Sequence, residues 1–113
     1  MRLSLGTMQI GGELSKYESF KILDHYFFSG NFKFDTAPMY PVPASKEKFN
    51  LSEEIIGEWI NSLSKRDKSR IKVSTKFSNY SKKLKYLRKN NNRVISYNEL
   101  KQSLLSSLEK LNL

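Results

Sequence analysis

Stretches with the two-residue period of a strand alternate with stretches that have the period of a helix along these 113 residues. Residues 3–8, 32–36 and 71–76 predict three short strands, each bounded by turn or polar residues. A helical pattern follows each of them. Strict alternation of this kind favours parallel strands joined by right-handed crossovers, so the sequence predicts an α/β fold.

Three serines mark the expected beginnings of the helices. Ser15 with Glu18, and Ser96 with Glu99, have the spacing of capping boxes, in which side chain and backbone bond reciprocally. Ser52 is expected to cap the second helix, because two acids follow it in the first turn, where the helix dipole favours them. The first helix is placed at about residues 16–29.

Each predicted helix has one apolar face. In the first helix this face consists of Phe20, Leu23, Tyr26 and Phe27, and Gly30 follows where a left-handed cap is favourable. In the second it consists of Ile55, Ile56, Trp59, Ile60 and Leu63. In the last it consists of Leu100, Leu104, Leu108 and Leu111. We expect the apolar stripe of the second helix to be buried.

The composition excludes several classes of site. The chain has no cysteine, so it has neither disulfides nor thiolate metal ligands, and we predict no metal site. The first residues reach turn formers without a long apolar run, which argues against a signal peptide. No apolar stretch approaches the roughly 20 residues of a membrane span. The expected location is therefore the cytoplasm.

Positive charge is concentrated in residues 65–93. This segment holds twelve lysines and arginines and one acid, Asp67, so its net charge is +11 while the rest of the chain carries −2. A basic segment can bind nucleic acid or a phosphorylated ligand. A solvated, lysine-rich surface loop explains the same residues, and we favour that interpretation.

Residues suited to chemistry stand at the ends of the predicted strands. Residues 6–8 end the first strand, Asp35 the second and Lys76 the third, and Tyr40 follows in a proline-rich loop. No Gly-x-Gly-x-x-Gly pattern follows the first strand, so a Rossmann fingerprint is absent. The other common parallel architecture is the (βα)8 barrel, in which the active site lies at the C-terminal ends of the strands. In a barrel these residues would share one rim.

In this order the motifs resemble those of the aldo/keto reductases. The matching pieces are Leu-Gly-Thr-Met at residues 5–8 with the glycines at 11 and 12, Asp-Thr-Ala at 35–37 with Tyr40, Ser-Glu-Glu-Ile-Ile-Gly-Glu-Trp at 52–59, Thr-Lys at 75–76, and the serine and leucine pattern of residues 103–111. The resemblance covers nearly the whole chain. It implies that residues 1–113 are a partial aldo/keto reductase domain, with three of the eight units of a (βα)8 TIM barrel that stops before strand four.

The resemblance also implies a reaction, the reduction of an aldehyde or ketone to an alcohol with NADP(H). Asp35, Tyr40 and Lys76 match three members of the family's catalytic tetrad. Gly6, Thr7 and Met8, together with Asp35, match positions near the nicotinamide end of the cofactor. The fourth member is a histidine at the end of strand four. The sole histidine of this chain, His25, is expected to be an ordinary residue near or on the packed face of the first helix.

The residue types suit this chemistry. When hydride adds to a carbonyl carbon, the developing alkoxide needs a proton, which a tyrosine such as Tyr40 can donate. A nearby lysine cation favours the phenolate form of the tyrosine. A carboxylate partner holds that lysine in place, because an ammonium group that is partly withdrawn from water needs a counterion. Tyr40 would thus be the general acid, Lys76 its modulator and Asp35 the partner of Lys76.

A complete (βα)8 barrel needs about 250 residues. We therefore expect an N-terminal fragment that is inactive alone, with open strand edges and an uncovered apolar sheet face that promote self-association. The partner implied by the resemblance is a small carbonyl substrate, with no membrane involved and nucleic acid disfavoured. The alternative is a non-catalytic binding or interaction module that uses the basic segment 65–93.

Overall fold

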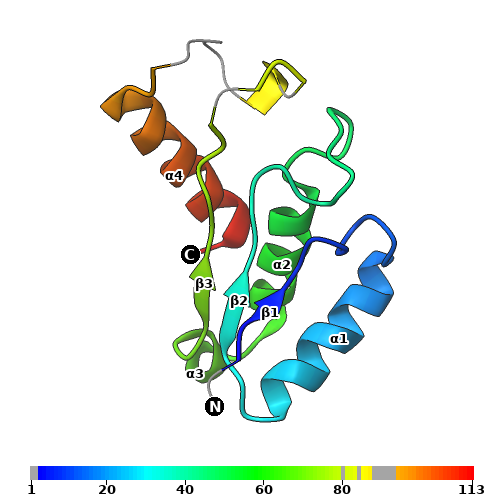
Figure 1. Cartoon of the computed structure of the whole chain (residues 1–113). Coiled ribbons are helices and arrows are strands. Elements are labelled where there is room, and N and C mark those ends of the chain that lie inside the picture. The colour runs from blue at the N-terminus through cyan, green and yellow to red at the C-terminus, as the bar shows by residue number, and fades with distance from the viewer. Residues whose placement is uncertain (1–2, 80, 84, 88–93) are drawn as a thin grey trace.

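The computed structural model describes residues 3–79, 81–83, 85–87 and 94–113 (Figure 1). Its elements in chain order are β1 (Leu5–Gly6), α1 (Lys16–Phe28), β2 (Lys33–Asp35), α2 (Leu51–Ser62), α3 (Lys65–Lys68), β3 (Lys72–Ser74), the 3-10 helix η1 (Lys85–Leu87) and α4 (Tyr97–Leu111). The predicted alternation is present. The strands are shorter than the sequence pattern indicated, and the one-turn helix α3 was not predicted.

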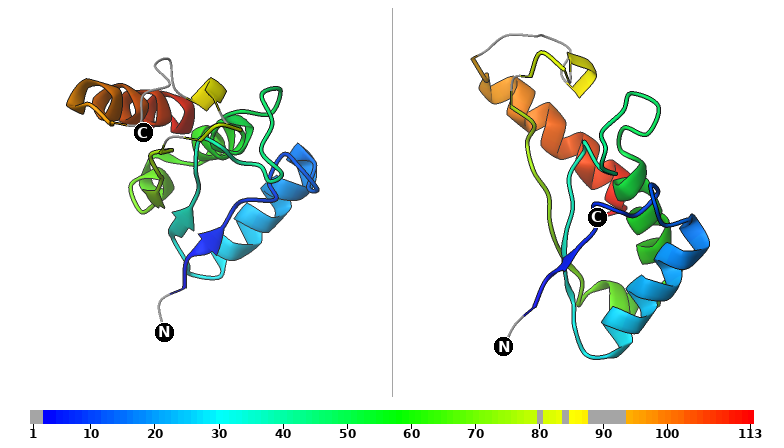
Figure 2. Two further views of the ribbon diagram at one scale, coloured as in Figure 1. Left: turned by 45° about the horizontal axis from the view of Figure 1, so that its top comes forward. Right: turned by 45° about the vertical axis from the view of Figure 1, so that its right-hand side comes forward.

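The three strands form one parallel sheet in the order β1-β2-β3. Phe34 is in register with Leu5 on one side and Val73 on the other. The helices α1, α2 and α4 lie on the same side of this sheet, as right-handed crossovers require (Figures 1 and 2). The parallel α/β arrangement predicted from the sequence is therefore confirmed.

The two faces of the sheet differ in polarity. Phe34, which is fully buried, faces the helices, and its register partners belong to the same face. The opposite face carries Lys33 and Asp35 from β2 and Lys72 and Ser74 from β3. The expected apolar surface is thus not found on the uncovered face of these strands, because its residues are polar or charged.

The core lies between the sheet and the helices α1 and α2. Trp59 is at its centre, with its ring centroid 5.2 Å from that of Phe34 and 5.8 Å from that of Phe27. Its indole Nε1 donates a hydrogen bond of 2.8 Å to Asp24. The apolar faces predicted for the first two helices are confirmed: six of their nine residues are buried, and Phe20, Tyr26 and Leu63 pack against the buried cluster.

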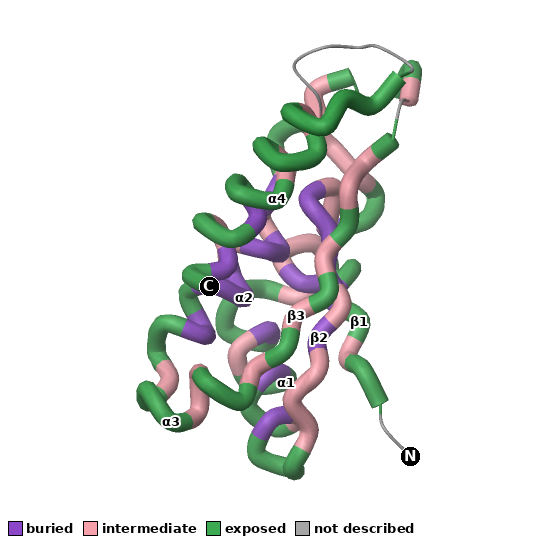
Figure 3. Tube along the Cα trace, turned by 90° about the vertical axis from the view of Figure 1, so that its left-hand side faces the viewer, coloured by how far each residue is buried: buried purple, intermediate pink, exposed green. Residues whose placement is uncertain are grey.

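Helix α4 is attached differently. Much of α4 is exposed (Figure 3). Of its apolar face, Leu111 is buried, but Leu100, Leu104 and Leu108 are 46%, 52% and 37% exposed. The C-terminal end of α4 packs on α2, where a Cβ added to Gly57 would lie 1.9 Å from a backbone oxygen of α4. This close approach fixes α4 by its C-terminal end, while Leu100 and Leu104, nearer its beginning, stay about half exposed.

Most of the predictions for the helix ends are confirmed. Both capping boxes, at Ser15 and at Ser96, form as predicted, and Gly30 has a φ of +92° after α1. Ser52 does not cap α2. The N-cap is Asn50 in the left-handed conformation, and the buried Ser52 donates its hydroxyl to the carbonyl of Ile10 at 2.6 Å.

The basic segment 65–93 is folded over part of its length, since it includes α3 and β3. Several of its charges have partners within the chain. The Arg70 guanidinium lies 3.6 Å from Asp67 and 5.0 Å from the ring centroid of Phe27, and Lys68 donates to Asn61 at 2.8 Å. These contacts favour the surface interpretation. Arg88, Lys89 and Arg93 lie outside the described residues.

Candidate active site

The candidate site lies where the three strands end. Gly6, Asp35 and Ser74 are in register across the sheet, and each is followed by a threonine. We call Thr7, Thr36 and Thr75 the threonine row. Backbone hydrogen bonds extend the sheet to this row. The amide of Thr7 donates to the carbonyl of Asp35 at 3.1 Å, and that of Thr36 donates to the carbonyl of Ser74 at 2.9 Å.

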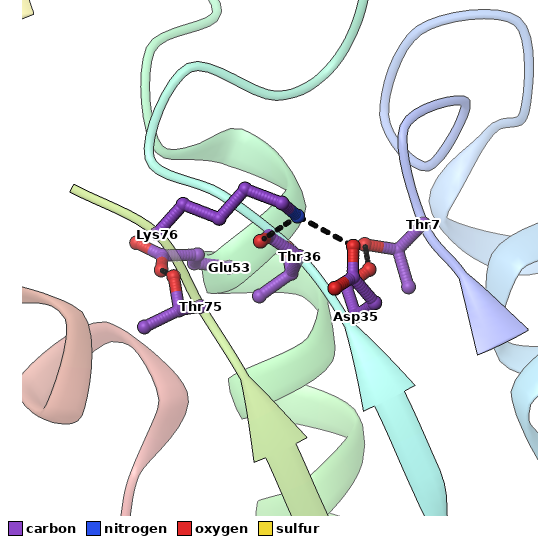
Figure 4. A network of polar contacts seen from close by, with 6 residues as sticks. All are labelled: Thr7, Asp35, Thr36, Glu53, Thr75 and Lys76. Carbon is purple, nitrogen blue, oxygen red and sulfur yellow. Dashed lines mark hydrogen bonds and ion pairs between the residues drawn. The ribbon is translucent and has the colours of Figure 1, made fainter. Parts of the chain in front are cut away.

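Asp35 and Lys76 form an ion pair on the uncovered face. Lys76 is two residues beyond Ser74, so its side chain returns to the face that carries Asp35. Its Nζ lies 2.5 Å from Oδ1 of Asp35 and donates to the carbonyl of Thr36 at 2.9 Å (Figure 4). The side chains of Lys76 and Asp35 are 45% and 41% exposed, which leaves the pair accessible to a ligand.

Tyr40 is placed beside this pair by the loop after β2. The Nζ of Lys76 lies 5.0 Å from the centroid of the Tyr40 ring, within the range of a cation–π contact. The loop is anchored at this point, because the Tyr40 amide donates to the carbonyl of Ala37 at 3.1 Å. The structure thus brings together Asp35, Tyr40 and Lys76, while their catalytic roles stay predictions.

The surroundings of Lys76 favour its charged form. Partial burial lowers the pKa of Lys76, but the hydrogen bond that Lys76 donates to the Asp35 carboxylate, together with the neighbouring Tyr40, outweighs burial and raises that pKa above its ordinary value. Lys76 therefore carries a positive charge across the neutral range. A cation fixed at this place favours negative charge on groups beside it, Tyr40 included.

The residues predicted to bind the cofactor are not equally placed to do so. Gly6 is exposed, and a Cβ added to it would meet nothing within 4 Å, so the sheet face above it is open. Met8 is 52% exposed. Thr7 is 1% exposed, and its Oγ1 donates to the carbonyl of Asp35 at 2.9 Å. The Thr7 side chain therefore supports β2 and does not reach the open face.

Glu53 was missed as part of the site, because its sequence position was explained as a first-turn acid of α2. It is fully buried, and its Oε1 accepts a hydrogen bond of 2.6 Å from the Thr75 hydroxyl (Figure 4). Its Oε2, like Oγ1 of Thr36, is buried without a hydrogen-bond partner among the described residues. Burial raises the pKa of Glu53, and hydroxyl groups, that of Thr75 foremost, oppose the shift only in part. The sequence offered one signal for this part of the site, a threonine directly after each of the three strands.

His25 takes no part in this site. It lies in the last turn of α1 and its side chain is exposed, not near the packed face as expected. Since α1 runs back along the sheet, its last turn is at the end where β2 begins, opposite the candidate site (Figure 1). Within the described ranges there is also no group of three or more His, Cys, Asp or Glu suited to a metal ion.

Comparison with known proteins assigns the chain to a family. Residues 2–113 match the aldo/keto reductase family. This chain therefore belongs to the aldo/keto reductases. Its alternating units and parallel sheet correspond to the N-terminal part of the (βα)8 barrel, as the sequence predicted.

Three curated relatives illustrate this similarity. The chain is 36% identical over 66 residues to Protein tas of Escherichia coli K12, 36% over 84 residues to aryl-alcohol dehydrogenase (NADP(+)) of Phanerodontia chrysosporium, and 32% over 118 residues to norsolorinic acid reductase B of Dothistroma septosporum. The matches cover 58%, 67% and 96% of this chain. They span only 19%, 20% and 28% of the relatives.

Proposed function

We propose that this chain carries part of the active site of an NADP(H)-dependent oxidoreductase that reduces an aldehyde or ketone to an alcohol. One observation carries the proposal: Nζ of Lys76 lies 2.5 Å from the Asp35 carboxylate and 5.0 Å from the centroid of the Tyr40 ring. Membership of the aldo/keto reductase family supports it, as do two relatives whose names denote a dehydrogenase and a reductase.

The open end of the sheet fits a flat, uncharged ring. Gly6 leaves free space above the first strand, and the exposed Met8 offers an apolar contact beside it. We propose that Gly6, Met8 and Asp35 line the place of the nicotinamide, and that Thr7 contributes by holding β2. When bound there, the cofactor would supply the hydride that adds to the carbonyl carbon of the substrate.

The residues of this chain supply the proton. As the C=O double bond opens, the carbonyl oxygen takes a proton from Oη of Tyr40, and the product is the alcohol. The phenolate left on Tyr40 is stabilised by the Lys76 ammonium and regains its proton from solvent. Asp35 keeps Lys76 in position by the charge-assisted bond from Nζ.

We further propose that residues 1–113 form part of one reductase domain and have little activity alone. The family's catalytic histidine has no counterpart in the chain, because His25 lies at the opposite end of the sheet. The free edges of β1 and β3 would favour self-association. A cytoplasmic location stays a prediction. Among the described residues no helix is long and apolar enough to span a membrane.

A chimaera tests the proposed function. Residues 1–113 would replace the segment that they match in norsolorinic acid reductase B, a match that covers 96% of this chain, and turnover of NADPH with a panel of aldehydes and ketones would be measured. We expect an active enzyme whose turnover falls by about 10²–10⁴-fold in Tyr40→Phe, the usual range for loss of a general acid. The isolated chain is the second sample, and we expect little NADPH oxidation from it.

The outcomes separate the two parts of this proposal. A folded chimaera that stays inactive, or one that is unaffected by Tyr40→Phe, contradicts the reductase assignment. Substantial oxidation of NADPH by the isolated chain, removed by Tyr40→Phe, contradicts only its expected inactivity. Tyr17→Phe is the matched control, because this tyrosine of α1 is exposed and does not belong to the contacts that join Asp35, Lys76 and Tyr40.

A further inference from the structure

The threonine row lies on the side of the sheet opposite the ion pair. Residues that follow each other in an extended chain point to opposite faces, so Thr75 points toward the helices while Lys76 points to the open face. In Figure 4 Glu53 of α2 lies beside Thr75, whereas the ammonium group of Lys76 reaches across to Asp35 of the neighbouring strand. Two successive residues thus contact two different acids.

Lys76 has little regular backbone structure to hold it. The paired residues of β3 end at Ser74, so Thr75 and Lys76 lie beyond the strand register. The long Lys76 side chain has to reach Oδ1 of Asp35 and the carbonyl of Thr36 from there. The hydrogen bond from Oγ1 of Thr75 to Oε1 of Glu53 ties the chain to α2 one residue before Lys76.

The burial of Glu53 is costly for the fold. The residue is 0% exposed, and one of its two carboxyl oxygens has no partner among the described residues. A buried carboxylate without full hydrogen bonding destabilises a protein, and an apolar residue of similar size would pack at lower cost. Ser52, the preceding residue, shows that α2 is otherwise docked by an ordinary hydroxyl-to-carbonyl bond.

We propose that Glu53 is a positioning residue for Lys76, acting through the hydroxyl group of Thr75. Glu53 fixes the rotation of the chain after β3, so that the ammonium group of Lys76 meets Asp35 and Tyr40. Nothing in this arrangement requires Glu53 to touch substrate or cofactor. The relevance to catalysis rests on the proposed function, whereas the placement of Lys76 does not.

The test measures Lys76 directly in the isolated chain. Lysines are labelled by reductive ¹³C-methylation, which keeps their charge, and the pKa of each is followed by NMR, with the Lys76 signal assigned from its loss in Lys76→Arg. Thr75→Val removes the donor at nearly constant volume and leaves the Glu53 charge. Glu53→Met removes the acceptor and the charge.

Two conservative variants are the matched controls. Thr75→Ser keeps a hydroxyl donor, and Glu53→Gln keeps an acceptor oxygen without the charge. We expect the pKa of Lys76 to lose most of its elevation in Thr75→Val and in Glu53→Met and to keep it in both conservative variants. The signal of Lys72, at the other end of β3, should not move in any of them.

Several outcomes would overturn the proposal. One is an unchanged Lys76 pKa in a folded Thr75→Val variant, even if its unfolding midpoint falls, because Glu53 would then have a purely structural role. Loss of the fold in Thr75→Val would likewise show that the bond between Thr75 and Glu53 has a purely structural role. If Glu53→Met alone fails to fold, the two Thr75 variants decide. None of these measurements needs catalysis, so an inactive chimaera would refute the reductase assignment separately.

Discussion

Polar groups lie on both sides of the strand ends, but they are exposed on one side and buried on the other. On the open side Asp35 and Lys76 are more than two fifths exposed, and they meet each other and Tyr40. On the helix side Thr7 and Glu53 are at most 1% exposed, and their partners are the backbone of β2 and the Thr75 hydroxyl. Groups that act on a ligand have to be reachable, whereas groups that hold them are most effective when buried.

The same contrast runs along the strands. Lys33 and Phe34 are neighbours in β2, yet one faces solvent and the other the core. Because successive side chains of a strand point to opposite faces, polar residues on the open face do not disturb the packing of the core. The contrast can be tested by substituting matched residues on the two faces.

The largest effect is expected for Phe34→Ala. This side chain is fully buried against Trp59, so its truncation should lower the free energy of unfolding by about 3–5 kcal/mol. Lys33→Ala, one residue away on the open face, should change it by no more than about 0.5 kcal/mol. Denaturant titrations of both variants check this difference. Similar losses in the two variants would show that the open face is covered in solution.

A smaller effect is expected for Gly57→Ala. The new methyl group would meet the carbonyl of Lys110 at 1.9 Å, so α4 has to shift, at a cost near or above the upper end of the 1–3 kcal/mol that is roughly typical of overpacking. Gly6→Ala is the control, because nothing lies within 4 Å of its added Cβ. Thermal unfolding followed by circular dichroism compares them. Equal midpoints would contradict the close packing of α4 on α2.

The smallest effect concerns the ion pair itself. The pKa of Lys76 is raised by Asp35 and Tyr40 despite partial burial, so the stabilisation is fully present below the unfolded value of 10.5 and is lost as the pH rises through the higher folded value. Since both side chains are nearly half exposed, Lys76→Met should cost at most about 1 kcal/mol, and less at high salt. The difference from the parent chain should be constant from neutral pH to about pH 10 and shrink above it. A difference that grows in alkali would contradict the ion pair.

The elements that the sequence predicted are those encoded by neighbouring residues. Ser15 with Glu18 and Ser96 with Glu99 need only each other to begin a helix, so both capping boxes were visible without a structure. The alternation of strands and helices was also predictable, because each element is indicated by residues close to one another in the sequence. The grouping of Asp35 and Lys76 followed from one further rule, that parallel strands end at one edge of a sheet.

Features that depend on distant partners were missed or misread. Ser52 has the spacing of a cap, but its hydroxyl is bound to Ile10, which no local pattern indicates. The leucines of α4 have helical spacing, and periodicity defines a face without saying whether another element covers it. Glu53 looks like any first-turn acid until Thr75, 22 residues further along, is placed against it.

The strand order β1-β2-β3 has a consequence for how the chain is made. Among the described residues, β2 and β3 each pair with the strand that precedes them in sequence, so each finds a partner that has already been synthesised. A chain emerging from the ribosome can then add one unit at a time to an existing edge, N-terminal part first. At each stage the edge of the newest strand is exposed. The rate of synthesis therefore influences whether that edge pairs with the next strand of the same chain or with a neighbouring chain.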